Sequence, residues 1–119
     1  MRCSVVLLIA YLVATPLGAQ ERPLVPEQFR GKWADSQVKC DAPSESSLWI
    51  EADRVDFYEG RGRVLAVHVV SPLEVEVELE SSGEGRVWHS TRRFRLSQDG
   101  RALTDVTRRD HQAVRVRCE

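Results

Sequence analysis

The sequence predicts an all-β fold: an antiparallel up-and-down meander of about eight short strands that closes into a small barrel, with a β-sandwich as the alternative. Three observations carry this prediction. Apolar residues alternate strictly with glutamates over residues 73–80, which is typical of a strand with one buried and one wet face. Runs of β-branched and aromatic residues recur about every 11 residues between turn-forming clusters. No apolar set repeats with the spacing of an amphipathic helix.

The chain begins with the three-part pattern of a secretory signal peptide, over residues 1–19. Arg2 supplies the positive charge, residues 5–13 form the apolar run, and Ala19 is a small residue at the cleavage position. The run is shorter than the roughly 20 residues that span a bilayer, and an uncleaved anchor stays the alternative. We therefore expect a periplasmic or secreted mature protein with no membrane span after signal cleavage.

The mature chain of about 100 residues suits one domain. Residues 20–28, with two prolines and three charges, are expected to form an extended leader, and residues 29–119 the barrel. The whole chain carries a formal net charge of −1, which becomes about −2 once Arg2 is removed. No large basic field is available to attract nucleic acid.

The mature chain has two cysteines, Cys40 and Cys118. An even count in an exported chain predicts a disulfide. A pair of metal ligands is the alternative, but neither cysteine has a second Cys or His at the spacing of a zinc site. We expect no metal and no cofactor.

Turn residues give a strand register. Gly83 in the motif SGEG suits a type II′ turn, which sets Leu79 opposite Trp88 and Glu74 opposite Arg93. The strands themselves are expected near residues 30–35, 47–52, 54–58, 63–70, 73–81, 86–96, 101–107 and 113–118.

Two further turns extend the register. The motif EGRG at 59–62 predicts a II′ turn that sets Phe57 opposite Val64, and QDGR at 98–101 predicts a I′ turn that sets Phe94 opposite Asp105. A one-residue bulge anywhere would invert all positions beyond it. Chained together, the turns give an inward set of Val55, Phe57, Val64, Ala66, His68, Val70, Leu73, Val75, Val77, Leu79, Trp88, Phe94, Leu96 and Leu103.

The same register turns four polar residues inward: His68, Ser90, Arg92 and Asp105. Because a lone buried arginine is costly, Arg92 and Asp105 are expected to contact each other, as a structural ion pair or as an anion-binding point. The alternative is a bulge that turns Arg92 out to water. We predict no catalytic residues, since Ser90 lies on a strand without a nucleophile elbow.

The triplet Gly31-Lys32-Trp33 resembles the G-x-W signature in the first strand of lipocalins. The resemblance implies that Trp33 packs at the closed barrel end under an arginine near the last strand, here Arg115 or Arg117. A cysteine bridge between the two ends of the domain also resembles small periplasmic protease-inhibitor barrels. The chain is shorter than a typical lipocalin, so the interior is expected to be filled by side chains.

The strand at 63–70 is apolar on both faces, which predicts that the leader, another envelope protein or a second copy covers Leu65, Val67 and Val69. We expect a non-enzymatic protein-binding or inhibitory module of the bacterial envelope; the alternative is a small-ligand carrier that uses the lumen. An empty lumen above about 300 Å³ would favour the carrier. A filled core with an exposed patch at Trp49 would favour the protein-binding module.

Overall fold

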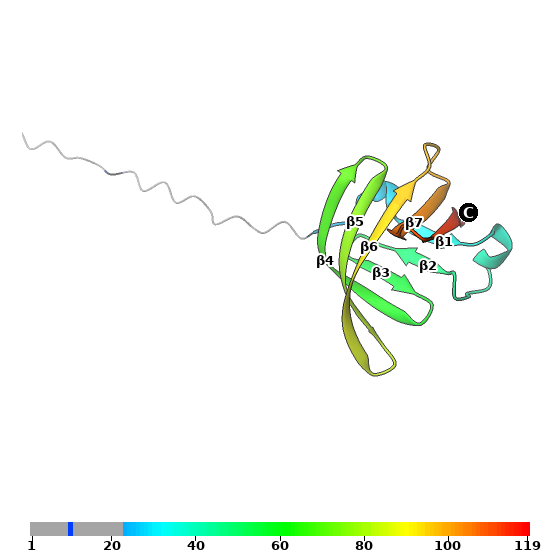
Figure 1. The fold of residues 1–119 in the computed structure, drawn as a ribbon, viewed down its shortest axis with the longest axis horizontal. Helices are drawn as coiled ribbons and strands as arrows, with labels where there is room; N and C mark the ends of the chain where they lie inside the picture. Colours follow the sequence, from blue (N-terminus) through cyan, green and yellow to red (C-terminus); the bar gives the residue numbers. More distant parts are fainter. Residues whose placement is uncertain (1–9, 11–22) are drawn as a thin grey trace, which may run out of the picture.

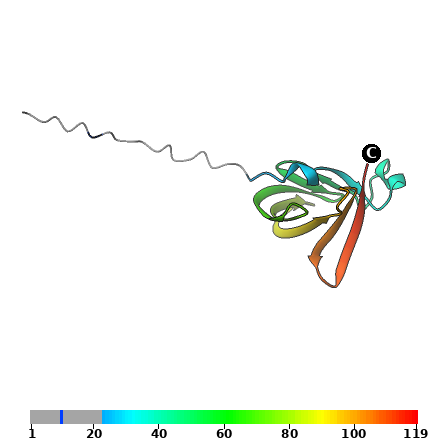
Figure 2. The same ribbon diagram turned by 90° about the horizontal axis from the view of Figure 1, so that it is seen from above.

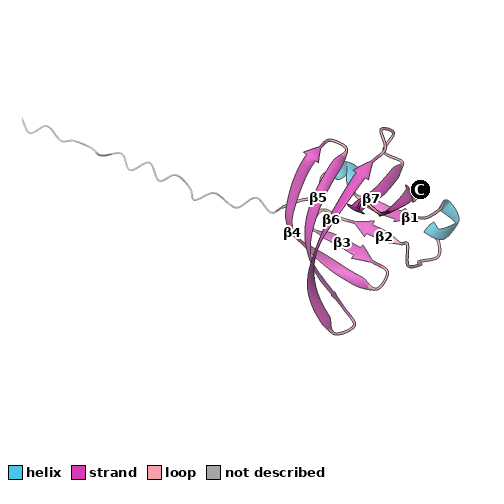
Figure 3. Ribbon diagram, viewed as in Figure 1, coloured by secondary structure: helices cyan, strands magenta, loops and turns pink. Residues whose placement is uncertain are grey.

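The computed structural model describes residue 10 and residues 23–119, so nearly all of the predicted signal peptide lies outside the described residues. Eight antiparallel strands follow one another in chain order and close into a barrel (Figures 1 and 3). This confirms the predicted meander and rejects the sandwich. The elements are η1 (Glu27–Phe29), β1 (Gly31–Ala34), η2 (Gln37–Cys40), β2 (Leu48–Ile50), β3 (Arg54–Phe57), β4 (Gly60–Ser71), β5 (Glu74–Gly83), β6 (Arg86–Leu96), β7 (Ala102–Arg108) and β8 (His111–Arg117).

The alternation of β5 builds both faces of the barrel wall. Val75, Val77 and Leu79 are fully buried, while Glu74 and Glu76 face outward and lie near arginines of β6. Glu74, for example, lies 2.8 Å from Arg95. The remaining core residues are Val25, Phe29, Trp33, Leu48, Ile50, Val55, Val64, Phe94, Leu96 and Leu103.

The leader closes one end of the barrel. Val25 and Phe29 are fully buried in the core, and the Val25 amide donates to the carbonyl of Ala52 at 2.8 Å. Val25 of the leader and Phe29 of η1 therefore fill the closed end, and Pro23 lines a surface depression together with Leu65 of β4.

The β5–β6 register differs from the predicted one by two residues. Glu84 and Gly85 both have positive φ, 50° and 74°, so the type I′ turn lies one residue later than the predicted II′ turn. Leu79 consequently faces Ser90, and Trp88 faces Ser81. Because the shift is even, every side chain keeps its predicted side of the sheet.

Of the other two turns, one register is wrong and one is right. The β3–β4 turn sets Phe57 opposite Gly60, not Val64. The strand pairing therefore continues to Gly60, which the sequence had placed in the turn. A Cβ at Gly62 would lie 2.7 Å from the Val55 carbonyl oxygen, so the two strands approach closely here. The β6–β7 turn has the predicted pairing of Phe94 with Asp105, although only one of its residues, a glycine, has positive φ.

A bulge in β4 overturns two predictions. The register shifts between Val64 and Ala66, so the positions beyond it are inverted. His68 lies opposite Glu76 on the outer face and is not part of the lumen. Val67 lies opposite Val77 and packs against the core, so the predicted outer stripe of Leu65, Val67 and Val69 does not form.

The barrel wall is incomplete beside β6. The β6–β7 ladder begins only at Phe94 and Asp105, whereas β5 pairs with β6 along its whole length. Figure 2 shows the hairpin of β7 and β8 turning away from the longer strands. Residues Arg86–Arg92 thus have a strand partner on one side only, and we call their free side the open seam.

Candidate ligand-binding site

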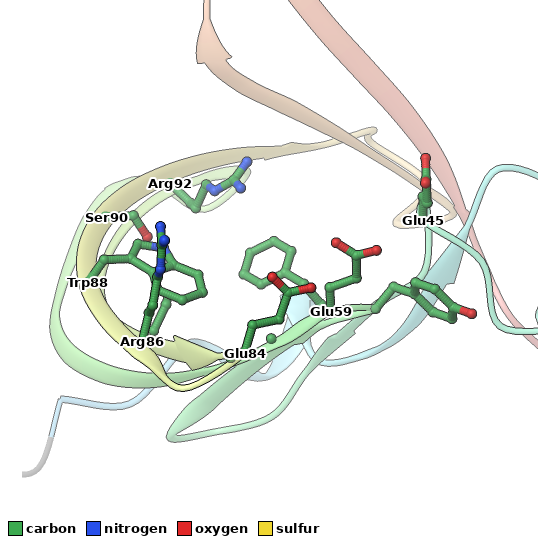
Figure 4. Close-up of a pocket in the computed structure, with 12 residues that line it drawn as sticks. Glu45, Glu59, Glu84, Arg86, Trp88, Ser90 and Arg92 are labelled. Atoms are coloured by element: carbon green, nitrogen blue, oxygen red, sulfur yellow. The ribbon is translucent and has the colours of Figure 1, made fainter.

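A cavity of about 630 Å³ opens at the end of the barrel opposite the leader (Figure 4). We call it the mouth cavity. It combines aromatic faces, two serine hydroxyls and charged groups of both signs. Its lining residues are Glu45, Phe57, Tyr58, Glu59, Gly60, Ser81, Gly83, Glu84, Arg86, Trp88, Ser90 and Arg92. Core side chains fill the barrel toward the closed end, and the prediction of a filled interior was wrong for the mouth.

Trp88 forms one wall of the mouth cavity and is 45% exposed. Its ring packs on two glycines, because a Cβ at Gly60 or Gly83 would lie 3.5 Å from ring atom Cη2. A Cβ at Gly83 would also come within 2.5 Å of the Glu59 carbonyl oxygen. The two glycines leave the space in which the indole lies along the wall.

Arg92 forms the floor of the mouth cavity, and Asp105 is its ion-pair partner. Arg92 Nη1 donates to Asp105 Oδ2 at 3.1 Å, and the guanidinium lies 4.7 Å from the Phe57 ring centre. Asp105 is largely buried, and its Oδ1 accepts from the amide and the hydroxyl of Thr107. The β5–β6 ladder has no register shift, which keeps Arg92 and Ser90 inside. The contact expected from the sequence is thus present.

Arg115 is a second guanidinium beside this pair. Its Nε donates to the Ser46 carbonyl at 2.6 Å, while its Nη1 is buried and has no hydrogen-bond partner among the described residues. Burial lowers the pKa of Arg115, and Arg92 acts in the same direction, whereas Asp105 and Asp35 raise it. Two guanidiniums therefore act on one buried carboxylate.

The barrel-end arginine is Arg117, not Arg115. Its guanidinium lies 4.3 Å from the ring centre of Trp33 and donates to the carbonyls of Gly100, Arg30 and Gln28 at 3.0, 2.6 and 2.6 Å. Alternate residues of a strand share a face, so Arg115 and Arg117 both point into the lumen. Arg115 lies two residues before Arg117 along β8, away from the closed end. The two-residue spacing of these arginines was visible in the sequence, but the resemblance considered each of them only as a candidate for the barrel end.

The other predicted site residues lie away from the mouth cavity or act structurally. Cys40 and Cys118 are bonded, with an S–S distance of 2.03 Å, as predicted.

Within residues 23–119, no three His, Cys, Asp or Glu side chains gather as they would around a metal ion. The same part of the chain has no helix with the length and apolar character that crossing a membrane requires.

Comparisons with protein families, curated proteins and solved structures found no match. The residues of the mouth cavity are therefore the basis for assigning a function.

A double-mutant cycle of Arg92→Ala and Asp105→Ala is expected to give a coupling energy of about 1–2 kcal/mol in thermal or denaturant unfolding. The Arg92 side chain is 38% exposed, so water screens the pair, and the coupling falls below the 3–5 kcal/mol of a fully buried pair. Full additivity of the two losses would mean that the two side chains do not interact in solution.

Proposed function

We propose that this protein is a non-enzymatic binding protein that holds a small ligand in the mouth cavity. The observation that carries the proposal is the volume of about 630 Å³, which lies in the range of small-molecule sites, roughly 300–1,000 Å³. This volume shifts the preference from the protein-binding module to the small-ligand carrier.

The composition of the lining supports the proposal. Phe57 and Trp88 offer aromatic faces, and Ser81 and Ser90 offer hydroxyls to orient a ligand. The closed end, with Arg117 over Trp33, resembles the lipocalin arrangement, and the disulfide is compatible with an oxidising compartment.

The test is a fluorescence titration of the oxidised protein with the neutral probe N-phenylnaphthylamine. Trp88→Ala is expected to weaken binding roughly tenfold, because the ligand loses one aromatic face. The matched control is Trp49→Ala, which removes a 52% exposed indole from the outside of β2 and should leave the affinity unchanged. Absence of saturable binding, or equal loss in both variants, would refute the proposal.

A second candidate function is the protein-binding module that was expected from the sequence. Trp49 and Tyr58 are both more than half exposed and line one shallow depression on the outside of the barrel. Exposed aromatic side chains of this kind are enriched at protein interfaces. This candidate predicts that Trp49→Ala abolishes capture of an envelope protein, whereas Trp88→Ala does not.

A further inference from the structure

We propose that the ligand of the mouth cavity carries one anionic group, a carboxylate, sulfonate or phosphate, at its buried end, and that Arg92, which lines the cavity, recognises it. This inference rests on the proposed function and names the chemical class of the ligand.

The first argument is charge. Arg92 contributes a positive charge to the floor, and its ion-pair partner Asp105 is shared electrostatically with a second cation, Arg115. Removing charge from water is costly unless a counter-charge lies nearby. Asp35 also attracts Arg115, but its side chain is about half exposed and lies next to Lys39. An anion at the floor would complete the neutralisation inside the cavity.

The second argument is the supply of hydrogen-bond donors. Among the described residues, Arg92 donates only through Nη1, to Asp105, and the rest of its guanidinium lies at the cavity, where Figure 4 shows it. A guanidinium presents its donors in a planar fork that fits two oxygens of one anion.

Preorganisation is the third argument. Asp105 holds one edge of the Arg92 guanidinium and Phe57 lies against its face, at 4.7 Å. Asp105 is itself held by the amide and hydroxyl of Thr107. Arg92 is thus fixed before a ligand arrives, so little side-chain entropy remains to be lost on binding.

The rim limits the ligand to a single negative charge. Glu45, Glu59 and Glu84 line the opening of the same cavity with one cation, Arg86, so three negative charges and one positive charge leave the rim net negative (Figure 4). A second anionic group at the outer end would meet these carboxylates and be repelled. The favoured ligand therefore has an anionic inner end, an aromatic or apolar body beside Trp88, and a neutral or cationic outer end.

The test compares anilinonaphthalene sulfonate with neutral N-phenylnaphthylamine, two probes that differ by the sulfonate. We expect the oxidised protein to bind the sulfonate at least roughly tenfold more tightly, the usual size of a charge-assisted hydrogen bond. Arg92→Gln should abolish this preference without changing the affinity for the neutral probe. Arg101→Gln, which removes the same charge from an exposed position at the closed end, should change neither affinity.

Asp105→Asn provides a second variant, because it removes the negative charge that opposes a bound sulfonate, while the amide oxygen still accepts from Thr107 and Phe57 still lies against Arg92. We expect several-fold tighter sulfonate binding, whereas a purely structural ion pair predicts weaker binding of both probes. Equal affinity of the native protein for both probes, or equal loss in Arg92→Gln and Arg101→Gln, would overturn the inference. Saturable, Trp88-dependent binding of the neutral probe would still support the proposed function in that case.

Discussion

Replacing Cys40 and Cys118 together by serine is expected to lower the free energy of unfolding by about 4–5 kcal/mol. The bond closes a loop with a sequence separation of 78, and opening it gives the unfolded chain a large gain in conformational entropy. The loss is comparable to much of the net stability of a domain of this size. Urea unfolding of the oxidised protein and of the double-serine variant measures it.

Reductant provides the control for this experiment. It should destabilise the native protein to the level of the double-serine variant and leave that variant unaffected. A variant that stays within about 1 kcal/mol of the oxidised protein would show that the bond constrains little. Cys118 also follows β8 directly, and its amide donates to the carbonyl of Lys32 at 2.8 Å. Loss of the disulfide should therefore first weaken the pairing of β8 with β1.

Trp33→Ala is expected to cost about 3–5 kcal/mol of stability, the usual range for removing a buried aromatic side chain. Trp33 is fully buried, its Nε1 donates to the Phe29 carbonyl at 3.1 Å, and its ring lies under Arg117. Removing the indole would leave a cavity at the closed end and take away the surface on which Arg117 lies. Denaturant unfolding followed by far-ultraviolet circular dichroism measures the loss.

Trp49→Ala is the matched control, since it makes the same chemical change on the outside of β2. Its cost should stay below about 1 kcal/mol, as for most surface substitutions. If the two tryptophan variants lost the same stability, the closed end would not depend on Trp33, and its arrangement with Arg117 would be incidental.

The alternation of apolar and polar residues was sufficient to predict the strands and most of the core. Period-two patterns survive any even error in register, so β5 and β6 kept their faces although their turn lies one residue later than predicted. Arg92 and Asp105 could be placed together for the same reason.

The β4 bulge could not be predicted in this way. A strand with apolar residues on both faces is compatible with two registers, and the choice follows from the curvature of the closed barrel, which is a tertiary property. The error removed His68 from the lumen and brought Val67 into it. The mouth cavity could not be predicted from the sequence either, because its lining comes from the loop before β2, the β3–β4 turn and the β5–β6 hairpin, whose relative placement is a tertiary property.

The open seam has a consequence for the mobility of the barrel. Arg93 donates its amide toward β7, to Thr107 Oγ1, and Leu96 donates toward β5, to the Leu73 carbonyl. Backbone groups alternate in direction along a strand, so Val87, His89 and Thr91 direct theirs into the seam. Such water-facing amides belong to the least protected part of a sheet. We therefore expect these amides to exchange their protons faster than those of the core around Phe94 and Leu103, so that the cavity wall at β6 can adjust to a ligand without opening the core.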